Sequence, residues 1–256
     1  MKVSILIVSW LQDRQWLEYC LRSIEKFASG FHETVVLVPD EELEQFKELV
    51  ELPKSALWIS YQRVPDKARW HLHHQVMKCR ADQYCLGADF ILHTDSDCIF
   101  SEPVTPEDYF AAGKPVMVME PYVRLAGCPW QPVVESVLKR AVTHEFMRRH
   151  PQVNPERVYP ALRKRLCQLH QQPFDDYVLS LKPDHPWGFS DHNVIGAFAW
   201  REFHDAYHWI DLSRHPRPHS KLIQFWSHSP PDQPQDMPSG GRCVPAEVIA
   251  KLLGPP

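Results

Sequence analysis

Four apolar runs alternate with helical patterns over the first hundred residues, and this alternation constrains the fold more than any other feature of the sequence. The runs, which we expect to form strands, span residues 3–8, 34–38, 57–61 and 90–93. The segments between them, which we expect to form helices, span residues 13–27, 41–52 and 68–85. Such alternation predicts an α/β fold with a mostly parallel sheet and right-handed crossovers. Ligands of open sheets of this type bind beyond the carboxyl ends of the strands.

The second half of the chain has a different pattern. The elements expected there are a strand at 115–119, two polar helices at 131–150 and 155–172, and a last strand at 222–226. With 256 residues, 44% of them hydrophobic, the chain is long enough for one domain with a substantial core. We expect this single domain to carry a helical insertion at residues 120–186, between a first part at 1–119 and a closing part at 187–256.

Charge, cysteine content and the length of the apolar segments limit the classes of protein to which the chain can belong. The net charge of −4 does not by itself indicate a nucleic-acid or membrane partner. The seven cysteines form an odd set without a C-x-x-C pair, which argues against a disulfide framework and a zinc cluster. No segment approaches the ~20 apolar residues that span a bilayer. We expect a cytoplasmic protein without a membrane span, as a monomer or weak dimer.

Two carboxylates interrupt the apolar run at residues 90–100. Asp95 and Asp97 flank Ser96 at the end of the expected strand. Carboxylates this close repel each other and are costly to desolvate, so they usually hold a cation or share a proton. A hard divalent ion that also binds phosphate oxygens suits them. The alternative is that both aspartates cap the following turn.

Glycine-rich phosphate-binding loops are missing. The chain has nine glycines, and none of the expected strands is followed by G-x-G-x-x-G or G-x-x-x-x-G-K-[ST]. Any phosphate must therefore be held by a metal ion and side chains.

With these features in place, the first half resembles the GT-A fold glycosyltransferases, most nearly the family 2-like group. The resemblance rests on the first strand with Arg14 beyond it and on the Asp95-Ser96-Asp97 DxD motif after three strand–helix units. It implies a nucleotide-diphosphate sugar donor, with UDP-glucose the commonest choice for the fold, and Mn²⁺ or Mg²⁺ as cofactor. It also implies that Asp97 and Asp95 bind the metal and that a late histidine completes its shell. His228 is the first candidate for that histidine and His219 the second.

Donor contacts are expected from residues at the strand ends and on the helix before the DxD strand. Gln75 and Lys78 are three residues apart and share a helix face. His71 and His74 have the same spacing, and a metal site there is a weaker alternative to a surface position. The expected donor-binding residues are Ser9, Arg14, Asp40, Gln75, Lys78, Asp95 and Ser96.

Asp191 is the predicted catalytic base. An inverting transfer needs a group that takes the proton of the acceptor hydroxyl, and Asp191 occupies a position like that of the base in inverting relatives. Alternatively Ser190 or Asp191 caps the following helix, or His192 takes the proton as the partner of Asp191. The other acidic candidates are Asp184, Asp175 and Asp176. A retaining reaction would need no such base.

The acceptor is predicted from a basic cluster and from aromatic residues. The two polar helices carry Lys139, Arg140, Arg148, Arg149, His150, Arg157, Arg163, Lys164 and Arg165. This cluster is either a solvated face or a surface for an anionic acceptor such as DNA with hydroxymethylated pyrimidines. A saccharide acceptor is the alternative, with Trp187 or Trp130 stacking on it. The expected acceptor-binding residues are Arg148, Arg149, Arg163 and Trp187.

Three other functions compete with sugar transfer. A phosphatase of the haloacid dehalogenase type would use Asp95 as nucleophile and Asp97 as acid/base, although its motif normally ends the first core strand. A nucleotidyltransferase would need a glycine-rich loop that is missing after Val8. The non-enzymatic alternative is a catalytically inactive protein that binds nucleotide sugars.

Overall fold

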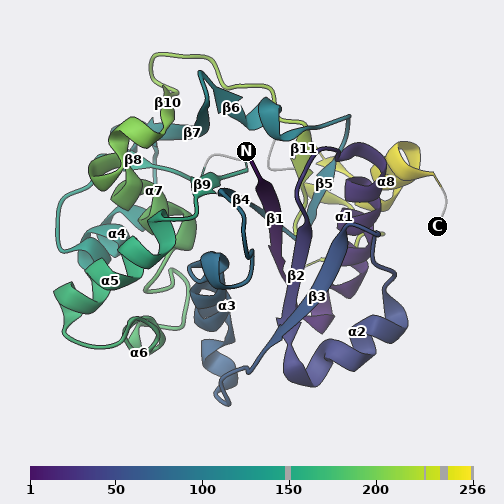
Figure 1. Ribbon diagram of the computed structural model, residues 1–256, viewed down its shortest axis with the longest axis horizontal. Coiled ribbons are helices and arrows are strands. Elements are labelled where there is room, and N and C mark those ends of the chain that lie inside the picture. Colours follow the sequence, from purple (N-terminus) through teal and green to yellow (C-terminus); the bar gives the residue numbers. More distant parts are fainter. Residues whose placement is uncertain (148–150, 228, 237–241, 255–256) are drawn as a thin grey trace.

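A five-stranded sheet forms the centre of the molecule (Figure 1). In this computed structural model, which describes residues 1–147, 151–227, 229–236 and 242–254, the strand order is β3-β2-β1-β4-β9. The strands are β1 (Val3–Val8), β2 (Thr34–Pro39), β3 (Ala56–Tyr61), β4 (Phe90–Asp95) and β9 (Val153–Pro155). The first four run parallel and β9 is antiparallel to β4. The predicted α/β fold with a mostly parallel sheet flanked by helices is confirmed.

Helices cover both faces of this sheet, because the side chains of β1 alternate between two cores. Ile5 and Ile7 belong to one core, and Leu6 and Val8 belong to the other. The first core is covered by α1 (Arg14–Phe27), α2 (Leu43–Leu49) and α8 (Pro245–Leu253). The second is covered by α3 (Trp70–Lys78), α4 (Trp130–Leu138), α5 (Val158–His170), α6 (Phe174–Ser180) and α7 (Asp191–Glu202). Figure 1 shows α4 to α7 to the left of the sheet and α1, α2 and α8 to its right.

The strand order reverses between β1 and β4. The chain moves outward from β1 through β2 to β3 and then returns to the other side of β1 with β4. At such a switch point the connections leave the sheet in opposite directions, which opens a crevice at the carboxyl ends. The turn that follows β1 and the Asp95-Ser96-Asp97 turn that follows β4 therefore border the same crevice.

A late segment of the chain is brought to that crevice by a short strand pair. β5 (Cys98–Phe100) pairs antiparallel with β11 (Leu222–Gln224). The backbone N–H of Phe225 then donates a hydrogen bond of 2.9 Å to the carbonyl oxygen of Asp97. Residues 222–227 consequently lie beside the acidic turn, more than a hundred positions away in sequence.

The second half also contains a small sheet, with the order β10-β7-β6 and with β8 paired to β7. Its strands are β6 (Phe110–Ala111), β7 (Lys114–Pro121), β8 (His144–Glu145) and β10 (His208–Asp211). A separate hairpin joins β12 (Gln235–Asp236) to β13 (Arg242–Cys243). All seven cysteines are free. None of the described helices is long and apolar enough to cross a membrane.

The helix expected at residues 131–150 is shorter than predicted. α4 ends at Leu138, and Lys139 adopts a left-handed conformation with φ of 52°. The side chain of Glu135 then accepts a hydrogen bond of 3.1 Å from the backbone of Val142, and residues 144–145 pair with the end of β7. The open edge of β7 takes up this segment as a strand, a tertiary interaction that local helical spacing does not reveal.

Candidate functional site

A cleft of about 820 Å³ opens at the switch point between β1 and β4. Its walls come from the end of β1, from α3, from the acidic turn, from the start of α7 and from residues 222–227. The predicted donor, metal, acceptor and base residues that line it are Gln75, Lys78, Asp95, Ser96, Asp97, Trp187 and Asp191, and the alternatives His71, His74, Trp130 and His192 line it too. The structure therefore brings two of the three predicted metal ligands, Asp95 and Asp97, and the predicted base into one cavity.

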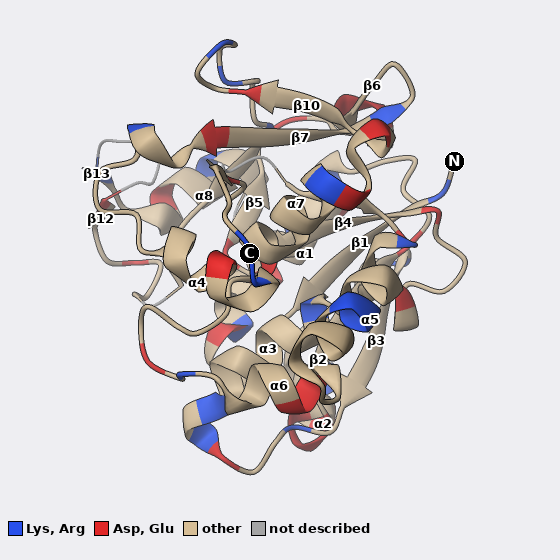
Figure 2. Ribbon diagram, turned by 90° about the vertical axis from the view of Figure 1, so that its left-hand side faces the viewer, with Lys and Arg blue, Asp and Glu red and all other residues tan. Residues whose placement is uncertain are grey.

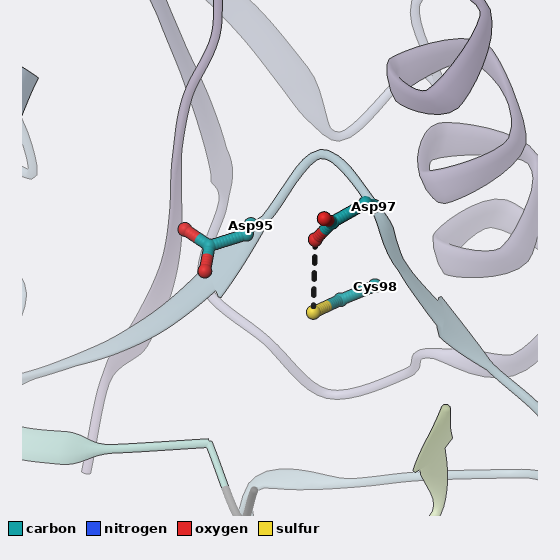
Figure 3. Close-up of side chains that lie close together, drawn as sticks. All are labelled: Asp95, Asp97 and Cys98. Carbon is teal, nitrogen blue, oxygen red and sulfur yellow. Dashed lines mark hydrogen bonds between the residues drawn. The ribbon is translucent and has the colours of Figure 1, made fainter. Parts of the chain in front are cut away.

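The acidic turn presents a compact group of possible ligand atoms (Figure 3). One ligand atom from each of Asp95, Asp97 and Cys98 lies within 4.8 Å of the others. Asp97 Oδ2 accepts a hydrogen bond of 3.1 Å from the backbone N–H of Ser227, and the Cys98 thiol donates to Asp97 Oδ1 over 3.8 Å. The late segment thus holds the side chain of Asp97 in place.

The two aspartates of the turn have opposite electrostatic environments. Burial raises the pKa of Asp97 to about 7, and the charge of Asp95 raises it as well. Burial also raises the pKa of Asp95, but Lys78 outweighs it and holds that pKa at about 2. Asp95 is therefore neutralised by Lys78, whereas ionised Asp97 needs a further cation.

The donor set of this turn fits a hard divalent cation. Two carboxylates offer oxygen ligands of the kind that Mg²⁺ and Mn²⁺ prefer. Burial raises the pKa of the Cys98 thiol well above its usual value, and a soft sulfur is not the ligand type that Mg²⁺ or Mn²⁺ prefers. A cation bound by Asp97 and Asp95 would offset the repulsion that raises the Asp97 pKa.

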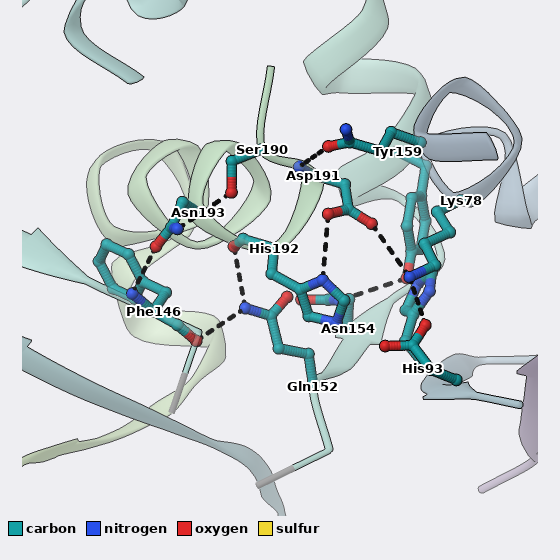
Figure 4. Close-up of polar contacts among 12 residues, drawn as sticks. Lys78, His93, Phe146, Gln152, Asn154, Tyr159, Ser190, Asp191, His192 and Asn193 are labelled. Carbon is teal, nitrogen blue, oxygen red and sulfur yellow. Dashed lines mark hydrogen bonds and ion pairs between the residues drawn. The ribbon is translucent and has the colours of Figure 1, made fainter. Parts of the chain in front are cut away.

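Lys78 connects the metal-binding turn to the start of α7 (Figure 4). Its Nζ atom lies 2.5 Å from Asp95 Oδ1 and 3.5 Å from Asp191 Oδ2. Burial lowers the pKa of Lys78, but the two carboxylates outweigh it, so the net shift is upward and the amine stays charged. One buried cation thereby fixes the relative position of the DxD strand and the candidate base.

Hydrogen bonds from three other segments hold the start of α7. Gln75 Oε1 accepts from the backbone N–H of Asp191 over 2.9 Å. Asn193 Oδ1 accepts from the backbone N–H of Phe146 over 2.8 Å, and Gln152 Nε2 donates to the carbonyl oxygen of His192 over 2.9 Å. These bonds satisfy polar groups that would otherwise be buried without partners. They also fix where the side chains at 191 and 192 point (Figure 4).

Comparison with known proteins gives the family and the fold. Residues 2–218 match the family described as "Family of unknown function (DUF6492)". The chain belongs to the DUF6492 family. No curated protein matches it significantly.

Among solved structures, this DUF6492 member is similar to galactosyltransferase LgtC, solved in complex with donor and acceptor sugar analogs. The match has a TM-score of 0.58 and 11% sequence identity, and it covers 98% of this chain and 95% of LgtC. At that identity the likeness shows the fold alone. The fold is GT-A, as the sequence resemblance implied.

Several residues predicted for the site lie elsewhere in this DUF6492 member. The Ser9 hydroxyl is fully buried and has no hydrogen-bond partner among the described residues. Asp40 is exposed after β2, one strand away from the switch point, and Arg14 begins α1. None of these three lines the cleft. His219 bonds to Glu102 on an exposed surface, while His228, Arg148 and Arg149 lie outside the described residues.

Arg163 also lies outside the cleft. Its guanidinium donates to Asp82 over 2.5 and 2.7 Å and to the carbonyl oxygen of Cys79 over 2.7 Å. These bonds attach α5 to the segment that follows α3. Basic and acidic segments are interspersed in the view of Figure 2. Among the described members of the predicted basic cluster, Arg140 is likewise paired, with Glu202.

Sequence reasoning missed several residues of the cleft. Asp13 accepts a hydrogen bond of 3.3 Å from the Ser96 hydroxyl, and burial raises its pKa to about 6. The sequence feature that could have identified Asp13 is a carboxylate a few residues after the first strand. His93 lies within the DxD strand itself, where its position among apolar residues indicated only packing. Trp226 and Ser227 also line the cleft. Strand pairing that no local sequence pattern reveals brings them there.

Proposed function

We propose that this protein is a metal-dependent glycosyltransferase that moves a sugar from a nucleotide-diphosphate donor to an acceptor hydroxyl. The observation that carries the proposal is one cleft with Asp95 and Asp97 on one wall and Asp191 and His192 on another. Sugar transfer needs neutralisation of a departing diphosphate at one end of the bond that breaks, and acceptance of a proton at the other. The GT-A fold supports the same reaction class.

In this proposal, Asp97 and Asp95 hold Mn²⁺ or Mg²⁺. The bound ion supplies charge neutralisation for the diphosphate leaving group. Ser227 orients Asp97 through its backbone, and Lys78 keeps Asp95 ionised. Gln75, Lys78, Asp95 and Ser96 remain the proposed donor-side residues, since all four line the cleft. The sugar is a hexose in this proposal, and UDP-glucose is the first donor to try.

On the acceptor side, the carboxylate and imidazole at the start of α7 support an inverting reaction. Trp187 is less suited to stack on a sugar, because its ring already stacks on His71 at 3.6 Å and on Trp130 at 5.9 Å between centroids. The pairing of Arg163 with Asp82 removes one cation from the proposed DNA surface. A saccharide hydroxyl is therefore the acceptor we favour, and the modified-DNA acceptor stays a prediction from sequence.

The test is thermal stabilisation by nucleoside diphosphates and their sugars, with and without Mn²⁺. A ligand at ~100 times its dissociation constant adds about 2.7 kcal/mol, which for a domain of this size raises Tm by roughly 5–10 °C. We expect one nucleotide to give a shift that needs Mn²⁺ and that is lost in Asp97→Asn. Asp205→Asn, which removes an exposed carboxylate outside the cleft, is the matched control and should keep the shift.

Other outcomes of the same assay identify the competing functions. Donor binding without release of nucleoside diphosphate, across an acceptor panel and with water, would indicate a protein that only binds nucleotide sugars. Release of phosphate from p-nitrophenyl phosphate, with no response to any nucleotide, would contradict the proposal and favour the phosphatase.

A further inference from the structure

Two possible proton acceptors stand next to each other at the start of α7. Asp191 and His192 both line the cleft, and Asp191 Oδ1 lies 3.1 Å from His192 Nδ1. Their side chains differ in exposure, at 9% for Asp191 and 19% for His192. The geometry around each group decides which of them suits the role of base.

Asp191 has two charged or polar neighbours. Oδ1 faces the imidazole of His192, and Oδ2, which makes no hydrogen bond to a described residue, lies 3.5 Å from the charged amine of Lys78. Burial raises the pKa of Asp191, but Lys78 and then His192 outweigh it, and the net pKa lies well below the usual value. A carboxylate held in this way binds a proton poorly at neutral pH.

The ring of His192 has the complementary arrangement. Because a carboxylate can only accept, Nδ1 carries the hydrogen in the bond to Asp191. In the neutral ring this leaves Nε2 with a lone pair. Nε2 makes no hydrogen bond to any described residue, and the side chain borders the cleft. The same logic orients the histidine of a serine protease through its aspartate.

We propose that His192 Nε2 takes the proton of the acceptor hydroxyl and that Asp191 positions the ring. The inference rests on the proposed function and deepens it, since sequence reasoning placed the base at Asp191 and left His192 as an alternative. As the acceptor oxygen bonds to the anomeric carbon, its proton moves to Nε2. The bond from that carbon to the phosphate oxygen breaks, and its electron pair leaves with the nucleoside diphosphate.

The surroundings of the ring suit the charge that it would gain. Asp191 bears the negative charge that stabilises an imidazolium. His93 on β4 lies at 6.1 Å between ring centroids, and burial lowers its pKa to about 3, so it stays neutral. Its Nε2 is 2.5 Å from the Tyr159 hydroxyl, which also accepts from Asn154. Among the described residues, Lys78 and Arg217 are the cations that line the cleft, and Lys78 is shared between Asp95 and Asp191.

The first test reads the tautomer without any substrate. In the full chain labelled with ¹⁵N-histidine, long-range ¹H–¹⁵N spectra distinguish an Nδ1–H ring from an Nε2–H ring. The signal missing in His192→Gln identifies His192. We expect Nδ1–H in the wild type and loss of that preference in Asp191→Asn. An Nε2–H ring in the wild type would overturn the proposal.

The second test measures turnover with water as the acceptor. The donor is the nucleotide sugar found by thermal stabilisation, with Mn²⁺, and the product is the released nucleoside diphosphate. We expect His192→Gln to lower kcat about 10²-fold or more, with donor affinity within twofold of wild type. Added imidazole should raise the rate of His192→Ala. His32→Gln, which changes an exposed histidine outside the cleft, should match the wild type.

Two results would overturn this assignment while leaving sugar transfer intact: a wild-type kcat in His192→Gln, or no response of His192→Ala to imidazole. Failure of the wild type to bind any nucleotide sugar or release nucleoside diphosphate would instead overturn the proposed function, and this inference with it.

Discussion

At the scale of single residues, the two aspartates of the acidic turn are expected to affect stability in opposite directions. The folded-state pKa of Asp97 is raised from 3.8 to about 7, so the folded protein binds the extra proton between these values. The contribution of Asp97 to stability should therefore fall as pH rises from about 4 to 7. In metal-free buffer at pH 8, we expect Asp97→Asn to stabilise the protein by at least about 1 kcal/mol, which is roughly 2–4 °C in Tm. The stabilisation by Asp97→Asn should become smaller towards pH 5, and melting curves recorded between pH 5 and 8 would measure this change.

Asp95→Asn is the matched comparison. The folded-state pKa of Asp95 is lowered to about 2 by Lys78, against the effect of burial. Its ion pair therefore contributes stability above pH 4 that is lost as pH falls towards 2. Removing the Asp95 charge leaves buried Lys78 with Asp191 alone, and we expect a lower Tm at pH 8. The same sign of change for both variants would contradict the opposite environments described for the two carboxylates.

At the scale of elements, α7 depends on a close approach at Gly196. A Cβ atom there would lie 2.3 Å from Cγ and 2.5 Å from Cβ of Phe146, and Phe146 is itself tied to Asn193. Alanine normally stabilises a helix interior by roughly 0.5–1 kcal/mol relative to glycine. Overpacking costs about 1–3 kcal/mol, so we expect Gly196→Ala to lower Tm.

Because a shift of α7 would also move residues 191 and 192, Gly196→Ala should lower turnover together with Tm. Arg201→Ala, which changes an exposed position of the same helix, serves as control and should stay within about 0.5 kcal/mol. A Tm above that of the wild type would show that α7 has room at this position. Denaturation curves of the two variants would decide.

Some of the strands could be located from their local sequence, and others could not. The strands at β1 to β4 are apolar runs bounded by polar residues, so their side-chain pattern alone was enough to locate them. Residues 144–145 form a strand because β7 offers an open edge. β5 and β11 likewise form only as a pair. Such pairings depend on residues distant in sequence, which explains why a strand at 222–226 was expected but its pairing with β5 beside the acidic turn was not.

At the scale of the whole molecule, the sheet order determines which predicted residues meet. Asp95, Asp97 and Lys78 could be placed from sequence, because a strand end and the helix before it define that edge. Ser9 and Asp40 also follow strands, but Ser9 is buried and β2 lies off the switch point. Arg163 was chosen for its charge, and its partner Asp82 is close only in the folded chain. Strand order and pairing of charges are tertiary properties that a local pattern does not contain.

The arrangement of the two cores leads to a last prediction, on cooperativity. Successive residues of β1 are buried in opposite cores, so neither core can be lost without exposing one face of the shared sheet. We therefore expect one unfolding transition, as a single domain over residues 1–256 requires, despite the helical segment between residues 120 and 186. Circular dichroism and tryptophan fluorescence should give coincident curves, and the calorimetric enthalpy should equal the van't Hoff enthalpy. Tryptophans pack in both cores, Trp16 and Trp58 in one and Trp130, Trp187, Trp200 and Trp209 in the other, so fluorescence samples both. A second transition in either signal would instead mean that the half covered by α4 to α7 unfolds as a unit of its own.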